Sequence, residues 1–265
     1  MRKGFQILMW IVLGTYIFLA LGFTEEKRAE RKCTDIEIVI PEGELYRFFN
    51  KKDVERIIQG NGLNIKGYSI DEINIGKIEN ILRKSSYVKK VDVFFTVDGV
   101  MTIRIKQRIP VVRIITSGGA TYYIDKDGFI LPASRKFAPH ILVANGDFNM
   151  GEQLRESMNL NEIKNKDFYK QWFDVLELAK YIEDDDFLKS QVVQVYLNSK
   201  KTFELIPRVG AHQIIIGDAS DLDSKFFKLE VLYKEGLKSE GWNKYQKIDL
   251  RFKNQIICTK KPNYD

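Results

Sequence analysis

The chain is poor in the residues from which most catalytic and metal sites are built. Its 265 residues include only two cysteines, Cys33 and Cys258, and only two histidines, His140 and His212. Two distant cysteines exclude a disulfide-rich scaffold and a four-cysteine zinc site. The sequence also lacks a phosphate-binding loop, a dinucleotide-binding glycine motif, a serine-hydrolase elbow and a zinc-protease motif. It therefore gives no positive support for an enzyme, and we expect no catalytic residue, cofactor or metal.

The few candidate residues for such chemistry have simpler interpretations. Cys258 falls in an apolar strand pattern and is predicted to be a structural thiol. His140 follows a proline and His212 precedes a strand, so both are expected in turns or on the surface. The acidic run 183–186 lacks the spacing of a calcium loop and is expected to be a solvated helix end.

Charge is not concentrated in the body of the chain. The formal net charge is +6, and residues 1–33 supply half of it, with six Lys and Arg against three acids. Residues 34–265 carry 36 basic and 33 acidic side chains. Binding to nucleic acid backbones needs a basic face, so this balance argues against a nucleic-acid partner.

A single long apolar run lies near the start of the sequence. Residues 5–23 contain no charged side chain, and at 1.5 Å per residue they would span roughly 28 Å, close to the apolar thickness of a bilayer. We predict a transmembrane anchor that includes Phe5, Trp10, Tyr16 and Phe23. A cleaved signal peptide is the alternative, but the run is longer than the usual apolar part of one. Charge on the two sides of the run leaves its orientation open.

Residues 34–110 show the pattern of a small α+β unit. Alternating apolar residues predict strands, helical spacing of apolar residues predicts two helices, and Asp98-Gly99 predicts a hairpin turn. The expected order is strand, helix, helix, strand, strand, with strands near 34–40, 91–96 and 101–106 and helices near 53–59 and 76–84.

Residues 111–260 are strand-rich and contain two further amphipathic helices. The expected elements are a hairpin at 122–131, helices at 168–182 and 222–237, and strands at 192–197, 203–206, 213–216 and 248–252. Tyr245–Lys260 is the last strand-forming stretch and is expected at or near a sheet edge. An open edge can accept a strand from a partner, but Lys247, Arg251 and Lys253 are equally typical of residues that prevent such pairing.

Several segments in this order resemble the bacterial cell-division family FtsQ, also called DivIB, in a form like that of the Bacteroidota. They are residues 78–82, 86–93, 106–114, 122–132, 225–237 and 241–252. The resemblance covers nearly the whole chain. It implies a cytoplasmic tail at 1–4, a transmembrane helix at 5–23, a linker at 24–33, a POTRA domain at 34–110, a β domain at 111–260 and a tail at 261–265. The implied β domain is a mixed α/β unit with a mainly antiparallel sheet.

The resemblance also implies the function and the partners. Members of the family are non-enzymatic scaffolds of the bacterial inner membrane at the division septum, with the N-terminus in the cytoplasm and the body in the periplasm. The implied partners are an FtsB-like and FtsL-like pair, septal wall synthesis proteins of the FtsW and FtsI type, and an FtsK-like protein. An FtsB-like strand would add beside the last strand, at Lys247, Ile248, Asp249, Leu250, Arg251 and Phe252, with Ile257 as the far limit of the contact.

Two other functions fit parts of the sequence. A membrane-anchored periplasmic accessory of protein assembly or secretion would also carry a POTRA domain, although one such unit before an unrelated β domain argues against it. An anchored periplasmic enzyme is the other alternative, and it lacks a recognisable motif.

Overall fold

The computed structural model describes residues 9–18, 31–41, 43 and 46–262. These residues form two compact units, divided between Gln107 and Arg108. Residues 9–18 are helical, and among the described residues no helix combines the length and apolar character needed to cross a bilayer. Trp10 and Tyr16 lie in this helix, whereas Phe5 and Phe23 of the predicted anchor lie outside the described residues.

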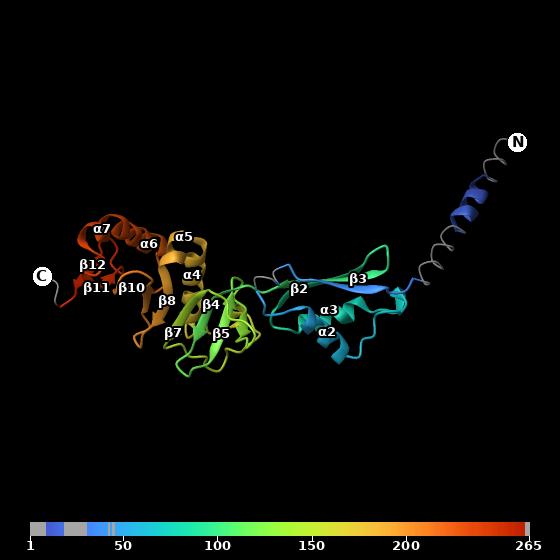
Figure 1. Cartoon of the computed structure of the whole chain (residues 1–265), viewed down its shortest axis with the longest axis horizontal. Coiled ribbons are helices and arrows are strands. Elements are labelled where there is room, and N and C mark those ends of the chain that lie inside the picture. The colour runs from blue at the N-terminus through green and yellow to red at the C-terminus, as the bar shows by residue number, and fades with distance from the viewer. Residues whose placement is uncertain (1–8, 19–30, 42, 44–45, 263–265) are drawn as a thin grey trace. The chain divides into compact units, whose positions relative to one another are not determined.

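The N-terminal unit has the predicted order of strands and helices. A three-stranded sheet, with β3 between β1 and β2, is covered on one face by the helices α2 and α3 (Figure 1). β1 runs parallel to β3, and β2 is antiparallel to it. The elements are β1 (Asp35–Val39), α2 (Lys51–Gly60), η1 (Ile70–Glu72), α3 (Ile75–Arg83), β2 (Val88–Phe95) and β3 (Val100–Gln107).

Local signals in the sequence explain where these elements begin and end. Asn50 and Asp53 form a capping box at the start of α2, with reciprocal side-chain to backbone hydrogen bonds of 3.2 and 3.1 Å. Asn74 accepts the N–H of Lys77 at 2.9 Å and so caps α3. Gly99, with φ of +81°, makes the tight turn between β2 and β3.

The C-terminal unit is a nine-stranded mixed sheet in the order β12-β11-β10-β9-β8-β7-β4-β5-β6. Five of its eight strand pairings are antiparallel, as expected, and three are parallel. The helices α4 to α7 lie along one side of the sheet (Figure 1). The strands are β4 (Pro110–Ile115), β5 (Thr121–Asp125), β6 (Ile130–Pro132), β7 (Leu142–Gly146), β8 (Val192–Leu197), β9 (Phe203–Pro207), β10 (Gln213–Gly217), β11 (Tyr245–Asp249) and β12 (Ile257–Lys260).

The helices of this unit supply most of the apolar cover of the sheet. They are η2 (Leu160–Glu162), α4 (Lys170–Asp184), α5 (Asp186–Gln191), α6 (Leu222–Val231), the π-helical turn η3 (Leu232–Gly236) and α7 (Leu237–Glu240). Trp172 of α4 is completely buried and meets the ring of Phe148 edge-on, with centroids 5.8 Å apart. Within the acidic run 183–186, Asp185 caps α5 by accepting the N–H of Leu188 at 2.8 Å.

A buried ion pair anchors the beginning of the C-terminal unit. Arg108 Nη1 donates to Asp125 Oδ2 at 2.8 Å, and the guanidinium lies 3.6 Å from the centroid of the Phe129 ring. Asp125 Oδ1 also accepts the N–H groups of Asp127 and Phe129, at 3.0 and 2.8 Å. The carboxylate therefore fixes the turn between β5 and β6 and compensates the arginine.

Replacing this carboxylate is expected to destabilise the C-terminal unit. Asp125→Asn leaves the half-buried arginine without its counter-ion and should lower the free energy of unfolding by about 2–4 kcal/mol. Lys126→Ala, which removes an exposed ion pair with Asp184, should cost less than about 0.5 kcal/mol. Urea titrations followed by the fluorescence of Trp172 and Trp242 test this, and equal losses in the two variants would contradict it.

Candidate functional site

The free edge of the nine-stranded sheet is β12 rather than the strand before it. β11 pairs with β10 in parallel, from Lys247 opposite Gln213 to Asp249 opposite Ile215. On its other side β11 pairs antiparallel with β12. The predicted partner-binding residues Lys247, Ile248 and Asp249 thus lie in a strand with a neighbour on each side. The expectation of an open edge along Lys247–Phe252 is therefore corrected.

The other three predicted residues lie in the turn between β11 and β12. Leu250 is fully buried, and its N–H donates to the carbonyl of Ile215 at 2.9 Å. Arg251 pairs with the carboxylate of Asp249, with Nη2 and Oδ2 2.6 Å apart. Phe252 is 41% exposed. The structure brings these residues together in the turn, where the contacts of Leu250 and Arg251 hold the β11–β12 hairpin closed.

Lys228 of α6 holds this turn through hydrogen bonds to its backbone. Its Nζ donates to the carbonyl of Leu250 at 3.1 Å and to that of Phe252 at 2.5 Å. The bond from Leu250 to Ile215 and the two bonds from Lys228 end β11 and reverse the chain. Burial opposes ionisation of Asp249, but the hydrogen bonds from Arg251 outweigh it and lower the pKa of this carboxyl. The ion pair in the turn is thus maintained across the neutral pH range.

The hydrogen-bonding pattern shows which groups of β12 point outward. The N–H of Leu250 faces β10, so Asp249 and Lys247 face β12, where they lie opposite Ile257 and Thr259. Lys261 confirms this alternation, since its N–H donates to the carbonyl of Lys244 at 3.0 Å. The backbone N–H and C=O groups of Cys258 and Lys260 consequently point away from the sheet. Within the described residues, these outward groups have no backbone partner.

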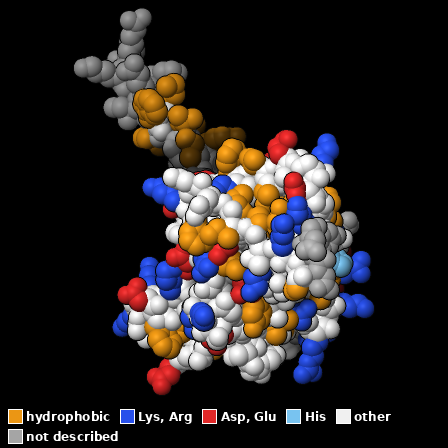
Figure 2. Space-filling model, turned by 90° about the vertical axis from the view of Figure 1, so that its left-hand side faces the viewer, with side chains coloured by type: hydrophobic (Ala, Val, Ile, Leu, Met, Phe, Trp, Pro, Cys, Tyr) orange, Lys and Arg blue, Asp and Glu red, His pale blue; other side chains and the backbone are white. Residues whose placement is uncertain are grey.

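The side chains of β12 give its two faces different character. Cys258 lies opposite the buried Ile248 and packs against the apolar core under the helices. Burial raises the pKa of the Cys258 thiol, which is the opposite of what a nucleophilic cysteine needs. Ile257 is 42% exposed and lies opposite Asp249 on the other face. Figure 2 views the unit from its β11–β12 end, where apolar, basic and acidic side chains are interspersed.

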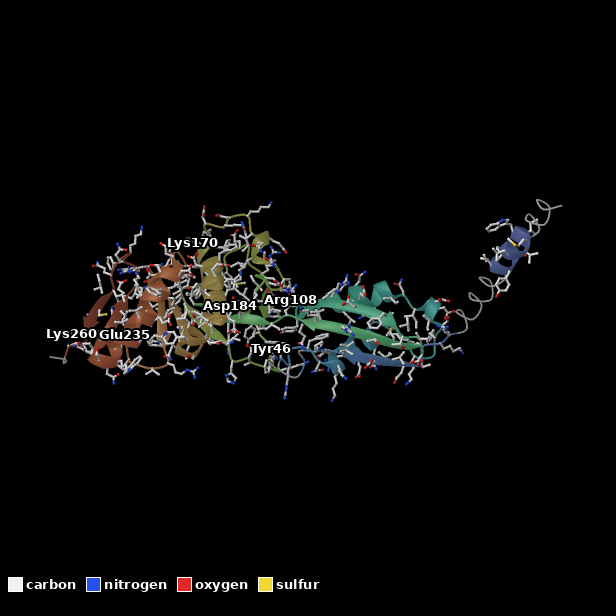
Figure 3. The ribbon with its side chains drawn as sticks, turned by 90° about the horizontal axis from the view of Figure 1, so that it is seen from above. Tyr46, Arg108, Lys170, Asp184, Glu235 and Lys260 are labelled. Carbon is white, nitrogen blue, oxygen red and sulfur yellow. The ribbon has the colours of Figure 1, made fainter. Side chains whose placement is uncertain are left out.

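The opposite edge of the same sheet is closed. The N–H of Ile130 donates to the carbonyl of Met158, and the carbonyl of Ile130 accepts the N–H of Ser157, both at 2.8 Å. Pro132, the last residue of β6, has no N–H to offer. Arg108 and Lys260 mark the two ends of this unit in Figure 3. Of the two sheet edges, β12 is the one that can accept a further strand.

Within the described ranges, no group of three or more His, Cys, Asp and Glu residues could hold a metal. A groove of about 620 Å³ lies where β10 and β11 end, and Ser220 and Lys225 meet there, with Oγ and Nζ 3.4 Å apart. Lys225 also donates to the carbonyl of Asp218 at 3.0 Å and contacts its carboxylate at 3.4 Å. Lys225 thus holds the segment Asp218–Ser220 to the start of α6.

His212 follows a bend, one of its two predicted positions, but it is buried and not on the surface. It is 3% exposed, and its Nε2 lies 2.8 Å from the hydroxyl of Tyr233 in η3. The tyrosine ring also meets Trp242 edge-on, with centroids 5.2 Å apart. This cluster packs the segment before β10 against the helices that lead to β11. Sequence reasoning missed it because Tyr233 and Trp242 are distant from His212 in the chain.

Burial of His212 should make the C-terminal unit less stable in mild acid. Burial lowers the pKa of His212 below the ordinary 6.5, outweighing the opposite effect of the Trp242 carbonyl. The unfolded chain therefore takes up a proton first, so the stabilisation present above about pH 6.5 is lost as the pH falls, by at most about 1.4 kcal/mol per pH unit. Urea titrations at several pH values between about 7.5 and 5.5 measure it.

A pair of variants isolates this effect from that of the carboxylates. His212→Gln should remove part of the loss of stability on acidification. His140→Gln, which changes an exposed histidine, should leave the pH dependence of the parent chain intact. Identical pH profiles for His212→Gln and the parent would contradict the assignment.

Comparisons with known proteins match the two units separately. A family model described as FtsQ/DivIB, C-terminal related, matches residues 109–259. A POTRA-like domain model matches residues 31–106. No curated protein matches the chain. The two matched ranges correspond to the two compact units of the structure.

Proposed function

Because the chain belongs to the FtsQ/DivIB, C-terminal related family, which gives it a role in cell division, we propose that it is a non-enzymatic scaffold of the divisome. It binds an FtsB-like protein, in a pair with an FtsL-like protein, by strand addition. FtsW-like, FtsI-like and FtsK-like proteins are further partners in this proposal, through which it controls septal wall synthesis.

The observation that carries the proposal is the open outer edge of β12. A partner strand there would form backbone hydrogen bonds with the outward N–H and C=O groups of Cys258 and Lys260. Ile257, 42% exposed, gives an apolar contact on one face of the added strand. The fixed turn at Leu250 and Phe252 holds β12 in register before the partner arrives, which lowers the ordering cost of binding.

The proposed location is the bacterial inner membrane at the septum, with both units in the periplasm and residues 5–23 as the anchor. The helical residues 9–18 support this part of the proposal. Their large apolar side chains are exposed on several sides, among them Trp10 at 66% and Phe18 at 79%. A helix that is apolar on all sides is typical of a membrane segment rather than of a surface helix.

Removing one outward N–H should weaken partner binding without unfolding the sheet. Cys258→Pro deletes a donor that points away from β11 and places a ring where the partner strand would pair. We expect binding to the periplasmic segment of an FtsB-like protein from the same bacterium to weaken by about tenfold or more. Isothermal titration calorimetry with the full chain measures the dissociation constant.

A proline in a turn provides the matched control. Ser199→Pro lies in the turn between β8 and β9, at the position after Asn198 where proline is favoured, and should leave the affinity unchanged. Hydrogen exchange of the complex should protect the amides of Cys258 and Lys260. Unchanged affinity in Cys258→Pro, or protection confined to other strands, would show that β12 is not the docking edge.

A further inference from the structure

Two exposed apolar side chains lie at the end of the N-terminal unit where the chain enters it through residues 31–34, the entry segment. Val97, in the turn between β2 and β3, is 84% exposed, and no large apolar side chain of the described residues is more exposed. Tyr68 is 48% exposed. The start of β1 and the β2–β3 turn lie at the same end of this unit (Figure 1). Turn positions favour polar residues, glycine and proline, so the fold of the turn itself does not account for the valine.

Hydrogen bonds place both side chains beside the entry segment. On one side of it, the N–H of Thr34 donates to the carbonyl of Gly99, in the turn, at 3.0 Å. On the other side, the N–H of Cys33 donates to the carbonyl of Tyr68 at 2.8 Å. The entry segment is therefore held between the turn that carries Val97 and the stretch that carries Tyr68.

The turn is tightly closed. The N–H of Thr96 donates to the carbonyl of Val100 at 2.9 Å, and its carbonyl accepts the N–H of Gly99 at 3.1 Å. Gly99, with φ of +81°, lies so close to the entry segment that a Cβ atom would be 2.9 Å from the carbonyl oxygen of Lys32. The exposure of Val97 is thus a fixed property of the turn, which presents an apolar side chain to whatever lies beside the entry segment.

The preceding sequence limits what can lie there. The uncharged run 5–23, proposed above as the membrane anchor, is separated from Arg31 by the seven residues 24–30. The eight Cα steps from Phe23 to Arg31 span at most about 30 Å when fully extended. An anchored chain therefore keeps this end of the unit near the bilayer surface. A short tether corresponds to an effective concentration in the millimolar range, so even a weak contact with the bilayer is populated.

The charges around the entry segment indicate that such a contact is apolar. Arg31 and Lys32 are exposed, and they are flanked by the exposed acids Asp71, Glu72 and Asp98. This mixture gives no net attraction to an anionic surface. The valine and the tyrosine suit the boundary between headgroups and acyl chains, since aliphatic side chains enter it and tyrosine is enriched there.

We propose that the N-terminal unit docks on the lipid bilayer through Val97 and Tyr68, which enter the interface on either side of the entry segment. The proposal rests on the anchor at 5–23 that is part of the proposed function, because the anchor supplies the proximity. It does not involve β12. Docking holds the β2–β3 turn against the membrane, so the unit does not swing freely on the residues that tether it.

Spin labels on the full chain in phosphatidylcholine nanodiscs test the contact. In a chain whose Cys33 and Cys258 are replaced by alanine, a nitroxide is attached at the single cysteine of Val97→Cys, Tyr16→Cys or Val209→Cys. Val209, 46% exposed between β9 and β10, is the matched control in the other unit. The accessibility of each label to oxygen, which concentrates in lipid, is compared with its accessibility to a water-soluble nickel chelate.

The label at position 97 should be reached by oxygen and shielded from nickel, whereas the label at position 209 should be open to nickel. A label at position 16 in lipid, together with a label at 97 as open to nickel as that at 209, overturns the docking and leaves the anchor standing. A label at 16 that is open to nickel removes the anchor and the docking with it. Shielding of position 97 from both reagents indicates a protein neighbour, such as a second copy of the chain, and also overturns the proposal.

A second set of variants tests the chemistry of the contact. A label attached through Asp98→Cys reports on the turn while position 97 is varied. Val97→Asp should expose this label to nickel, whereas Val97→Leu should keep it shielded. Raising the salt concentration from about 0.05 to about 0.5 M should change neither result, because an apolar contact is not screened. Equal accessibility in Val97→Asp and the parent turn, or release of the label by salt, would contradict docking through Val97.

Discussion

The parallel pairing of β11 with β10 determines what the C-terminal unit can do. The chain leaves β10, crosses the sheet through α6, η3 and α7, and returns beside β10 in the same direction. β11 thereby becomes an interior strand, and the hairpin after it places four residues at the edge. Burial of Leu250 and the two bonds from Lys228 hold that hairpin, so the exposed strand is supported by the core beneath the helices.

Both units have an edge strand, β1 in the first and β12 in the second. One side of each strand is paired with its neighbour in the sheet, and this pairing holds the other side in place. β1 is fixed to β3 through Asp35, Glu37 and Val39, and β12 is fixed to β11 through Ile257 and Thr259. The side chains beside the two edge strands differ in chemistry. Glu55 and Lys66 line the groove beside β1, whereas Ile257 is an exposed apolar side chain of β12.

Local patterns in the sequence were sufficient to predict the strands and helices, but not to predict which strands pair with each other. Alternation of Ile36, Ile38 and Ile40 and the Asp98-Gly99 turn predict β1 and the β2–β3 hairpin, because those signals arise within a few residues. The position of β11 depends on a crossover of more than 25 residues, which periodicity cannot reveal. The expected edge was therefore displaced by one strand. The burial of His212, which was predicted in a turn or on the surface, was missed for a related reason, since its partner Tyr233 approaches through tertiary packing.

The closed edge at β6 limits how far such a sheet can grow. Ser157 and Met158 occupy the outward groups of Ile130, and Pro132 contributes no donor there. Strand addition at β12 therefore cannot be repeated head to tail by copies of this unit, because the complementary β6 edge is occupied. The sheet is terminated after one incoming chain, which favours a fixed stoichiometry over fibre formation.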